Sequence, residues 1–100
     1  MNEATSEELK IAIESQHGGT ATFAETKSVT ETWQGKTVWN GTVHVFDLDG
    51  NPLANRAYAW SEPVEGSDKR TFYTVLHAPP VDSAKAAVRA SIVDRARRKA

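Results

Sequence analysis

The residues with the clearest chemical potential are two aspartates in the middle of the chain, Asp47 and Asp49, with one residue between them and Gly50 after them. They end an apolar run and form the acidic pair that most resembles a catalytic motif. The same stretch also predicts a hairpin corner, because glycine tolerates the positive φ that a tight turn requires. The corner and the catalytic pair are therefore two alternative interpretations of one segment.

The sequence Phe46-Asp47-Leu48-Asp49-Gly50 resembles the first motif of the haloacid dehalogenase phosphatases, in which a strand ends in Asp-x-Asp-Gly. The resemblance implies that Asp47 is a nucleophile and Asp49 a general acid/base. It also implies a parallel, doubly wound sheet. The family normally has a hydroxyl residue after the glycine, where this chain has Asn51. A small phosphatase is therefore an alternative function, and the hairpin corner is the interpretation we prefer.

Metal and thiol chemistry find little support in the sequence. The chain has no cysteine, which excludes disulfides, thiolate zinc sites and thiol catalysis. Its three histidines, His17, His44 and His77, are far apart in the sequence and form no short ligand pair. We expect no metal site and no cofactor.

Basic residues gather at the C-terminus. Residues 81–100 carry a net charge of +4 and the first eighty a net charge of -5, which gives the total of -1. Cations at the end of a helix complement its dipole and usually remain solvated. The alternative function is nucleic-acid binding through this basic helix, and its contacts would come from Arg95, Arg97, Arg98 and Lys99.

These residues need helices and strands to position them. The first helix is predicted from about Ser6 to Gln16, because Thr5 and Glu8 have the spacing of a capping box and Gly18-Gly19 follows. A last helix is predicted after Asp82, which we expect to be its N-cap. The stripe that this helix would bury is apolar and recurs every three to four residues: Val81, Ala84, Val88 and Ile92.

Four strands are predicted between the helices, over residues 20–33, 36–48, 55–61 and 70–77, from their β-branched and aromatic content. Gln34-Gly35 is the preferred first hairpin turn, and Asn40-Gly41 is the alternative turn. In residues 36–48 both alternating positions carry apolar residues. We interpret this as a bulge at Asn40-Gly41 that changes which side chains face the core.

The element order, helix, four strands, helix, with short links between strands, predicts an α+β fold with an antiparallel four-stranded meander. We expect a two-layer sandwich with both helices packed on one face. Ala57 and Ala59 are small enough to admit a helix there. The whole chain, 1–100, is expected to form one domain, with residues 1–5 and 97–100 as frayed ends.

If both helices cover one face, the other face is open and carries aromatic residues. Tyr58 and Trp60 alternate with the two alanines, so they would lie on that open face, with Arg56 at its edge. Exposed aromatic patches mark binding surfaces. The alternative is that these rings form the core beneath the helices.

These observations favour a small non-catalytic binding or interaction module rather than an enzyme. Its partner would be a protein or a second copy of the chain, bound through the aromatic face. The sequence has no run of about 18 apolar residues and no secretory signal, so we expect no membrane association. The absence of cysteine fits a reducing cytoplasm.

Overall fold

The computed structural model describes residues 5–99, and it describes side chains up to Arg95. Its element order is α1 (Ser6–His17), β1 (Thr20–Trp33), β2 (Lys36–Asp49), β3 (Arg56–Pro63), β4 (Arg70–Leu76) and α2 (Ala84–Lys99). The strands form one antiparallel sheet in the order β1-β2-β3-β4. The predicted α+β class, the meander and the element order are confirmed.

The capping residues predicted from the sequence are confirmed for α1, but the predicted N-cap of α2 is not. Thr5 and Glu8 form the capping box, and Gly18 follows the last turn of α1. The prediction that Asp82 is the N-cap of α2 is wrong. The side chain of the next residue, Ser83, accepts the amide hydrogen of Ala86 at 3.1 Å and thus caps the helix.

The first hairpin turns at Gln34-Gly35, as preferred. Both residues have positive φ, 52° and 78°, which is the type I′ geometry that joins twisted strands. The predicted bulge at Asn40-Gly41 is wrong, because Gly41 pairs regularly with Val29. The register shifts instead at Ala24 on β1 and at Val38 on β2.

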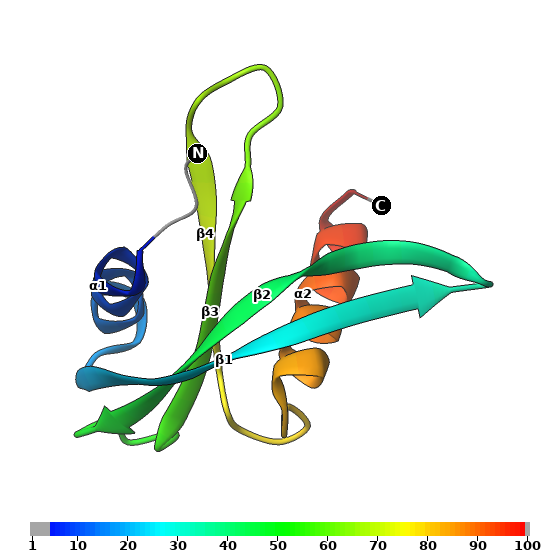
Figure 1. The fold of residues 1–100 in the computed structure, drawn as a ribbon. Helices are drawn as coiled ribbons and strands as arrows, with labels where there is room; N and C mark the ends of the chain where they lie inside the picture. Colours follow the sequence, from blue (N-terminus) through cyan, green and yellow to red (C-terminus); the bar gives the residue numbers. More distant parts are fainter. Residues whose placement is uncertain (1–4, 100) are drawn as a thin grey trace.

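The two helices cover opposite faces of the sheet, so the predicted two-layer arrangement is wrong (Figure 1). On one face Leu9 and Ile13 of α1 pack in a cluster of buried residues completed by Ala21, Phe46, Leu48, Ala57 and Ala59. On the other face α2 covers a second cluster, Val29, Val43, Val45, Tyr58 and Trp60. The physical reason is that β2 and β3 are apolar on both faces, so each face needs a cover.

The sheet consists of two hairpins joined by a short seam. The β1–β2 and β3–β4 ladders are long, but β2 and β3 pair only from His44↔Ala59 to Asp47↔Arg56. Beyond His44 the β1–β2 hairpin diverges from β3 and its tip extends past α2 (Figure 1). Trp33, near this tip, is 68% exposed.

Candidate functional site

The predicted aromatic face is not open. Tyr58 and Trp60 are 3% and 1% exposed and lie in the cluster beneath α2. Their alternation with Ala57 and Ala59 was predicted correctly, but the face to which they point carries a helix. Arg56 stays half exposed and lies 3.7 Å from Asp47. The expected binding patch of Tyr58, Trp60 and Arg56 is therefore replaced by a packed core with one arginine outside it.

Both buried rings have specific partners. The Tyr58 hydroxyl shares a hydrogen bond of 2.6 Å with Nδ1 of His77, and burial raises the pKa of Tyr58. Trp60 stacks on Tyr73 with ring centroids 5.7 Å apart and meets the edge of Trp39 at 5.9 Å. These contacts account for Tyr58 and Trp60 by packing.

The carboxylate of Glu62, near the end of β3, accepts hydrogen bonds from the polar groups of this aromatic cluster. The indole N–H groups of Trp39 and Trp60 both donate to its Oε2, at 2.7 and 3.1 Å. Arg95 of α2 donates to both carboxylate oxygens, at 2.9 and 3.1 Å, and its guanidinium lies 4.5 Å from the centre of the Tyr73 ring. We call Trp39, Trp60, Glu62, Tyr73 and Arg95 the Glu62 centre.

The Glu62 centre is suited to holding α2 on the sheet. Burial alone would raise the pKa of Glu62, but the hydrogen bonds from Arg95, Trp39 and Trp60 outweigh it and hold that pKa below its usual value. A carboxylate kept charged in this way is a poor acceptor of a catalytic proton. Arg95 was predicted as a nucleic-acid contact, and in the structure it is bound to Glu62 instead. The side chains of Arg97, Arg98 and Lys99 lie outside the described part of the chain.

The acidic corner is a structural turn. Gly50 has φ +80°, and Asn51 caps the following turn by accepting the amide hydrogens of Leu53 and Ala54. Asp47 lies opposite Arg56 in an antiparallel ladder. The parallel sheet that the phosphatase resemblance implied is therefore absent from the described residues. The corner is the turn that the sequence predicted, and it connects β2 to β3 in the register His44↔Ala59 to Asp47↔Arg56.

The histidines are not brought together. His17 bonds to Thr74 at 2.8 Å, His77 bonds to Tyr58, and His44 lies against the ring of Phe23. Within residues 5–95 the structure assembles no group of three side chains that could ligate a metal ion. No helix of the described residues is both long and apolar enough to cross a membrane.

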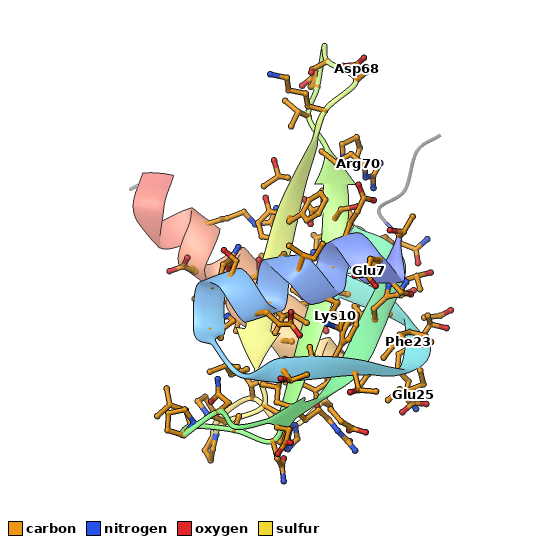
Figure 2. The ribbon with its side chains drawn as sticks, turned by 90° about the vertical axis from the view of Figure 1, so that its left-hand side faces the viewer. Glu7, Lys10, Phe23, Glu25, Asp68 and Arg70 are labelled. Atoms are coloured by element: carbon orange, nitrogen blue, oxygen red, sulfur yellow. The ribbon has the colours of Figure 1, made fainter. Side chains whose placement is uncertain are left out.

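The outer edge of β1 is a surface that the packing of the described residues leaves exposed. β1 is the first strand of the sheet, so the described residues pair with it on one side only. Its residues after the Ala24 bulge run without interruption from Glu25 to Trp33, and we call this segment the β1 edge. The side chains on its open face are all exposed: Thr26, Ser28, Thr30 and Thr32. Figure 2 shows Glu25 at the side of the molecule.

The direction of the backbone groups along the β1 edge follows from the ladder. Leu48 donates its amide hydrogen towards β3, to Asn55 at 2.9 Å. Backbone groups alternate sides along a strand, so between Trp39 and Leu48 the even residues of β2 direct their N–H and C=O groups towards β3 and the odd ones towards β1. The odd residues of β2 pair with odd residues of the β1 edge, such as Val29↔Gly41. The N–H and C=O groups of Thr26, Ser28, Thr30 and Thr32 therefore point outward.

Charged groups lie on the α2 side of the same edge. Lys27 lies 3.7 Å from Glu25, and a cavity of about 380 Å³ opens between these residues and the start of α2. Glu31 is the buried charged residue of the edge, 5% exposed. Its contacts with Arg89 are all 3.4 Å long, and the Arg89 side chain is 65% exposed.

No protein-family model, no curated protein and no solved structure matches the chain. The candidate site is therefore defined by its geometry alone.

Sequence reasoning placed a strand at residues 20–33 but did not assign it a role. The missing information was the sheet order, which makes this strand an edge. A signal was nevertheless present, since four hydroxyl residues alternate from Thr26 to Thr32, as expected for a strand with one solvated face. Glu62 was also missed, because the predicted third strand ended at residue 61, whereas β3 extends to Pro63.

Proposed function

We propose that this protein is a non-catalytic interaction module whose β1 edge pairs with an extended segment of another polypeptide. The observation that carries the proposal is the uninterrupted run from Glu25 to Trp33, exposed at a sheet edge, with outward backbone donors and acceptors. A strand added to such an edge gains main-chain hydrogen bonds along its length, and the side chains on either side give specificity.

The composition of the edge supports this role. Natural sheets protect long edges with proline, bulges or several lysines. Between Glu25 and Trp33 there is one lysine and no proline, and the bulge at Ala24 lies just before the run. The segment to be bound would be extended, rich in threonine or serine, and of mixed charge, to match Lys27 and Glu31. The lack of cysteine suits such a module in a reducing compartment such as the cytoplasm.

A displayed library of random peptides, selected on the folded protein, tests the proposal. Amide hydrogen exchange is then measured by NMR with and without a selected synthetic peptide. Binding at the edge slows exchange at Thr26, Ser28, Thr30 and Thr32, whose amides face outward. For a protein that is monomeric under these conditions, failure to select any peptide, or protection confined to other residues, would contradict the proposal.

Proline substitution at one outward amide gives a matched pair of variants. Ser28→Pro removes an outward donor and leaves the ladder to β2 in place, because proline is tolerated at strand edges. Ser28→Ala removes the hydroxyl and keeps the amide. The peptide should lose at least tenfold in affinity with Ser28→Pro and little with Ser28→Ala, with both variants melting close to the wild type. Equal affinities would exclude backbone pairing at this position.

A further inference from the structure

We infer that the strand bound at the β1 edge is the β1 edge of a second copy, antiparallel to the first, with the twofold axis at Val29. This inference rests on the proposed function and names its partner. It rests on three observations, namely the direction of the backbone groups, the order of charges along the strand, and the incomplete pairing of Glu31.

The backbone restricts the register. Two identical antiparallel strands pair residues whose numbers have a constant sum, and hydrogen-bonded pairs require outward groups on both strands. With Val29 on the axis, Thr26 is opposite the second copy's Thr32, and Ser28 is opposite the second copy's Thr30. All four residues direct their N–H and C=O outward, so the whole run from Glu25 to Trp33 can pair.

The charges select the same register. With Val29 on the axis, Lys27 is opposite the second copy's Glu31, and by symmetry this pair occurs twice. An axis at Lys27 would place that lysine opposite itself, and an axis at Ser28 would place Glu25 opposite Glu31. An axis at Thr26 would pair Glu25 with Lys27 but would run into the Ala24 bulge. Opposite charges directly across a ladder stabilise it, and like charges destabilise it.

Glu31 explains why a second copy is the fitting occupant. It is almost fully buried, and its contacts with the exposed Arg89 are longer than an ordinary charged hydrogen bond. A buried carboxylate needs better compensation than this. Lys27 of the second copy would approach on the same face of the sheet and supply it. Lys27 can form this pair, because its ion pair with Glu25 is long, 3.7 Å between Nζ and Oε1, and both side chains are exposed.

Sedimentation equilibrium of charge-reversed variants tests the inference. The wild type is expected to form a dimer. Lys27→Glu and Glu31→Lys each replace two attractive pairs by two repulsive pairs, so each should raise the dimer Kd by about ten- to hundredfold. An equimolar mixture of the two variants restores both attractive pairs, and it should dimerise more tightly than either variant alone. A wild type that is monomeric at its highest soluble concentration, or a mixture no tighter than its components, overturns the inference.

Cysteine cross-linking gives a second readout that does not depend on charge. The chain has no cysteine of its own, so single cysteines report single positions. Oxidised Val29→Cys should form a covalent dimer, because residues on the axis face each other across the ladder within disulfide range. Ser28→Cys is displaced from the axis and should not cross-link. If Glu31→Lys fails to fold, Glu31→Gln replaces it and should weaken the dimer without repulsion; an unchanged Kd then counts against the register.

The outcomes separate this inference from the proposed function. If the protein is monomeric but a selected peptide protects its β1 amides, the proposed function is supported and the second copy as partner is excluded. If the protein is monomeric and no peptide can be selected, both the proposed function and the inference are contradicted.

Discussion

At the scale of single residues, the carboxylate of Glu62 accepts hydrogen bonds from three different side chains. It joins two indoles of the sheet to a guanidinium of α2, and its side chain is 23% exposed. Three donor groups converge on one carboxylate, so the loss of its charge affects all of them. The Glu62 centre thus couples the sheet to the C-terminal helix.

Glu62→Gln should lower the free energy of unfolding by about 1–3 kcal/mol, because it leaves Arg95 half-buried opposite a neutral group. Urea unfolding followed by tryptophan fluorescence measures the change, since Trp39 and Trp60 both contact the altered group. Glu65→Gln makes the same chemical change at an exposed position in the β3–β4 loop and should be neutral. Equal stability of the two variants would show that the centre contributes nothing beyond packing.

The pKa of Glu62 also predicts how stability depends on pH. Its folded pKa lies below the ordinary value of 4.5, so the unfolded chain binds more protons between these two pKa values. The stabilisation by Glu62 is therefore complete above the unfolded pKa and is lost as the pH falls through the folded pKa. Urea unfolding over this range should show a smaller difference between wild type and Glu62→Gln as the pH falls. A difference that is constant down to about pH 3 would contradict this prediction.

At the scale of elements, the corner after β2 also fastens α1. The side-chain amide of Asn51 donates to the carbonyl of His17 at 2.9 Å, at the end of α1, while its oxygen caps the turn at Leu53 and Ala54. One side chain thus links the C-terminus of the first helix to the β2–β3 connection. The asparagine that departs from the phosphatase motif has a structural function here.

Asn51→Asp separates these two roles. It keeps the turn-capping oxygen but loses the donor to His17, and it places a negative charge at the negative end of α1. We expect a loss of about 1–2 kcal/mol in unfolding free energy near neutral pH, reduced in acid when the new carboxyl is protonated and can donate. Asn55→Asp adds the same charge at the same exposed corner and is the control. A loss as large for Asn55→Asp would assign the effect to charge alone.

The elements themselves were largely predictable from the sequence, because their signals are local. The capping box of Thr5 and Glu8, the Gln34-Gly35 turn and the Asp-Gly corner all act within a few residues. The error in β2 is instructive. Apolar residues at both alternating positions, Val43 and Val45 against Phe46 and Leu48, were interpreted as a bulge, whereas they mean that both faces of the strand are buried. Gly41 has another role, since a Cβ there would lie 3.0 Å from the Trp39 ring.

At the scale of the whole molecule, the positions of the helices decide what is surface. Both helices were predicted on one face of the sheet, but α2 covers the other face. Tyr58 and Trp60 are therefore core residues rather than an exposed patch, and the candidate site is the β1 edge instead. No local pattern contains this information, because it depends on which face each helix covers and on which strands lie at the edges of the sheet. The charges and hydroxyls of the β1 edge were visible in the sequence, but their exposure was not.

The arrangement of one sheet between two helices predicts how core mutations combine. Ile13 and Val88 are both 0% exposed, and they lie in separate clusters on opposite faces of the sheet. Ile13→Val should cost about 1 kcal/mol and Val88→Ala about 2 kcal/mol of unfolding free energy. Because the clusters share no member, the double variant should lose the sum to within about 0.5 kcal/mol.

Val45→Ala combined with Val88→Ala is the matched comparison, since both side chains belong to the cluster beneath α2. A cavity made by one substitution lets the neighbours of the other relax, so the combined loss should differ from the sum by more than in the first pair. Urea unfolding of the three single and two double variants, analysed with the wild type, gives both coupling energies. Strong coupling between Ile13 and Val88 would mean that the sheet transmits strain from one face to the other, and that the two clusters behave as one core.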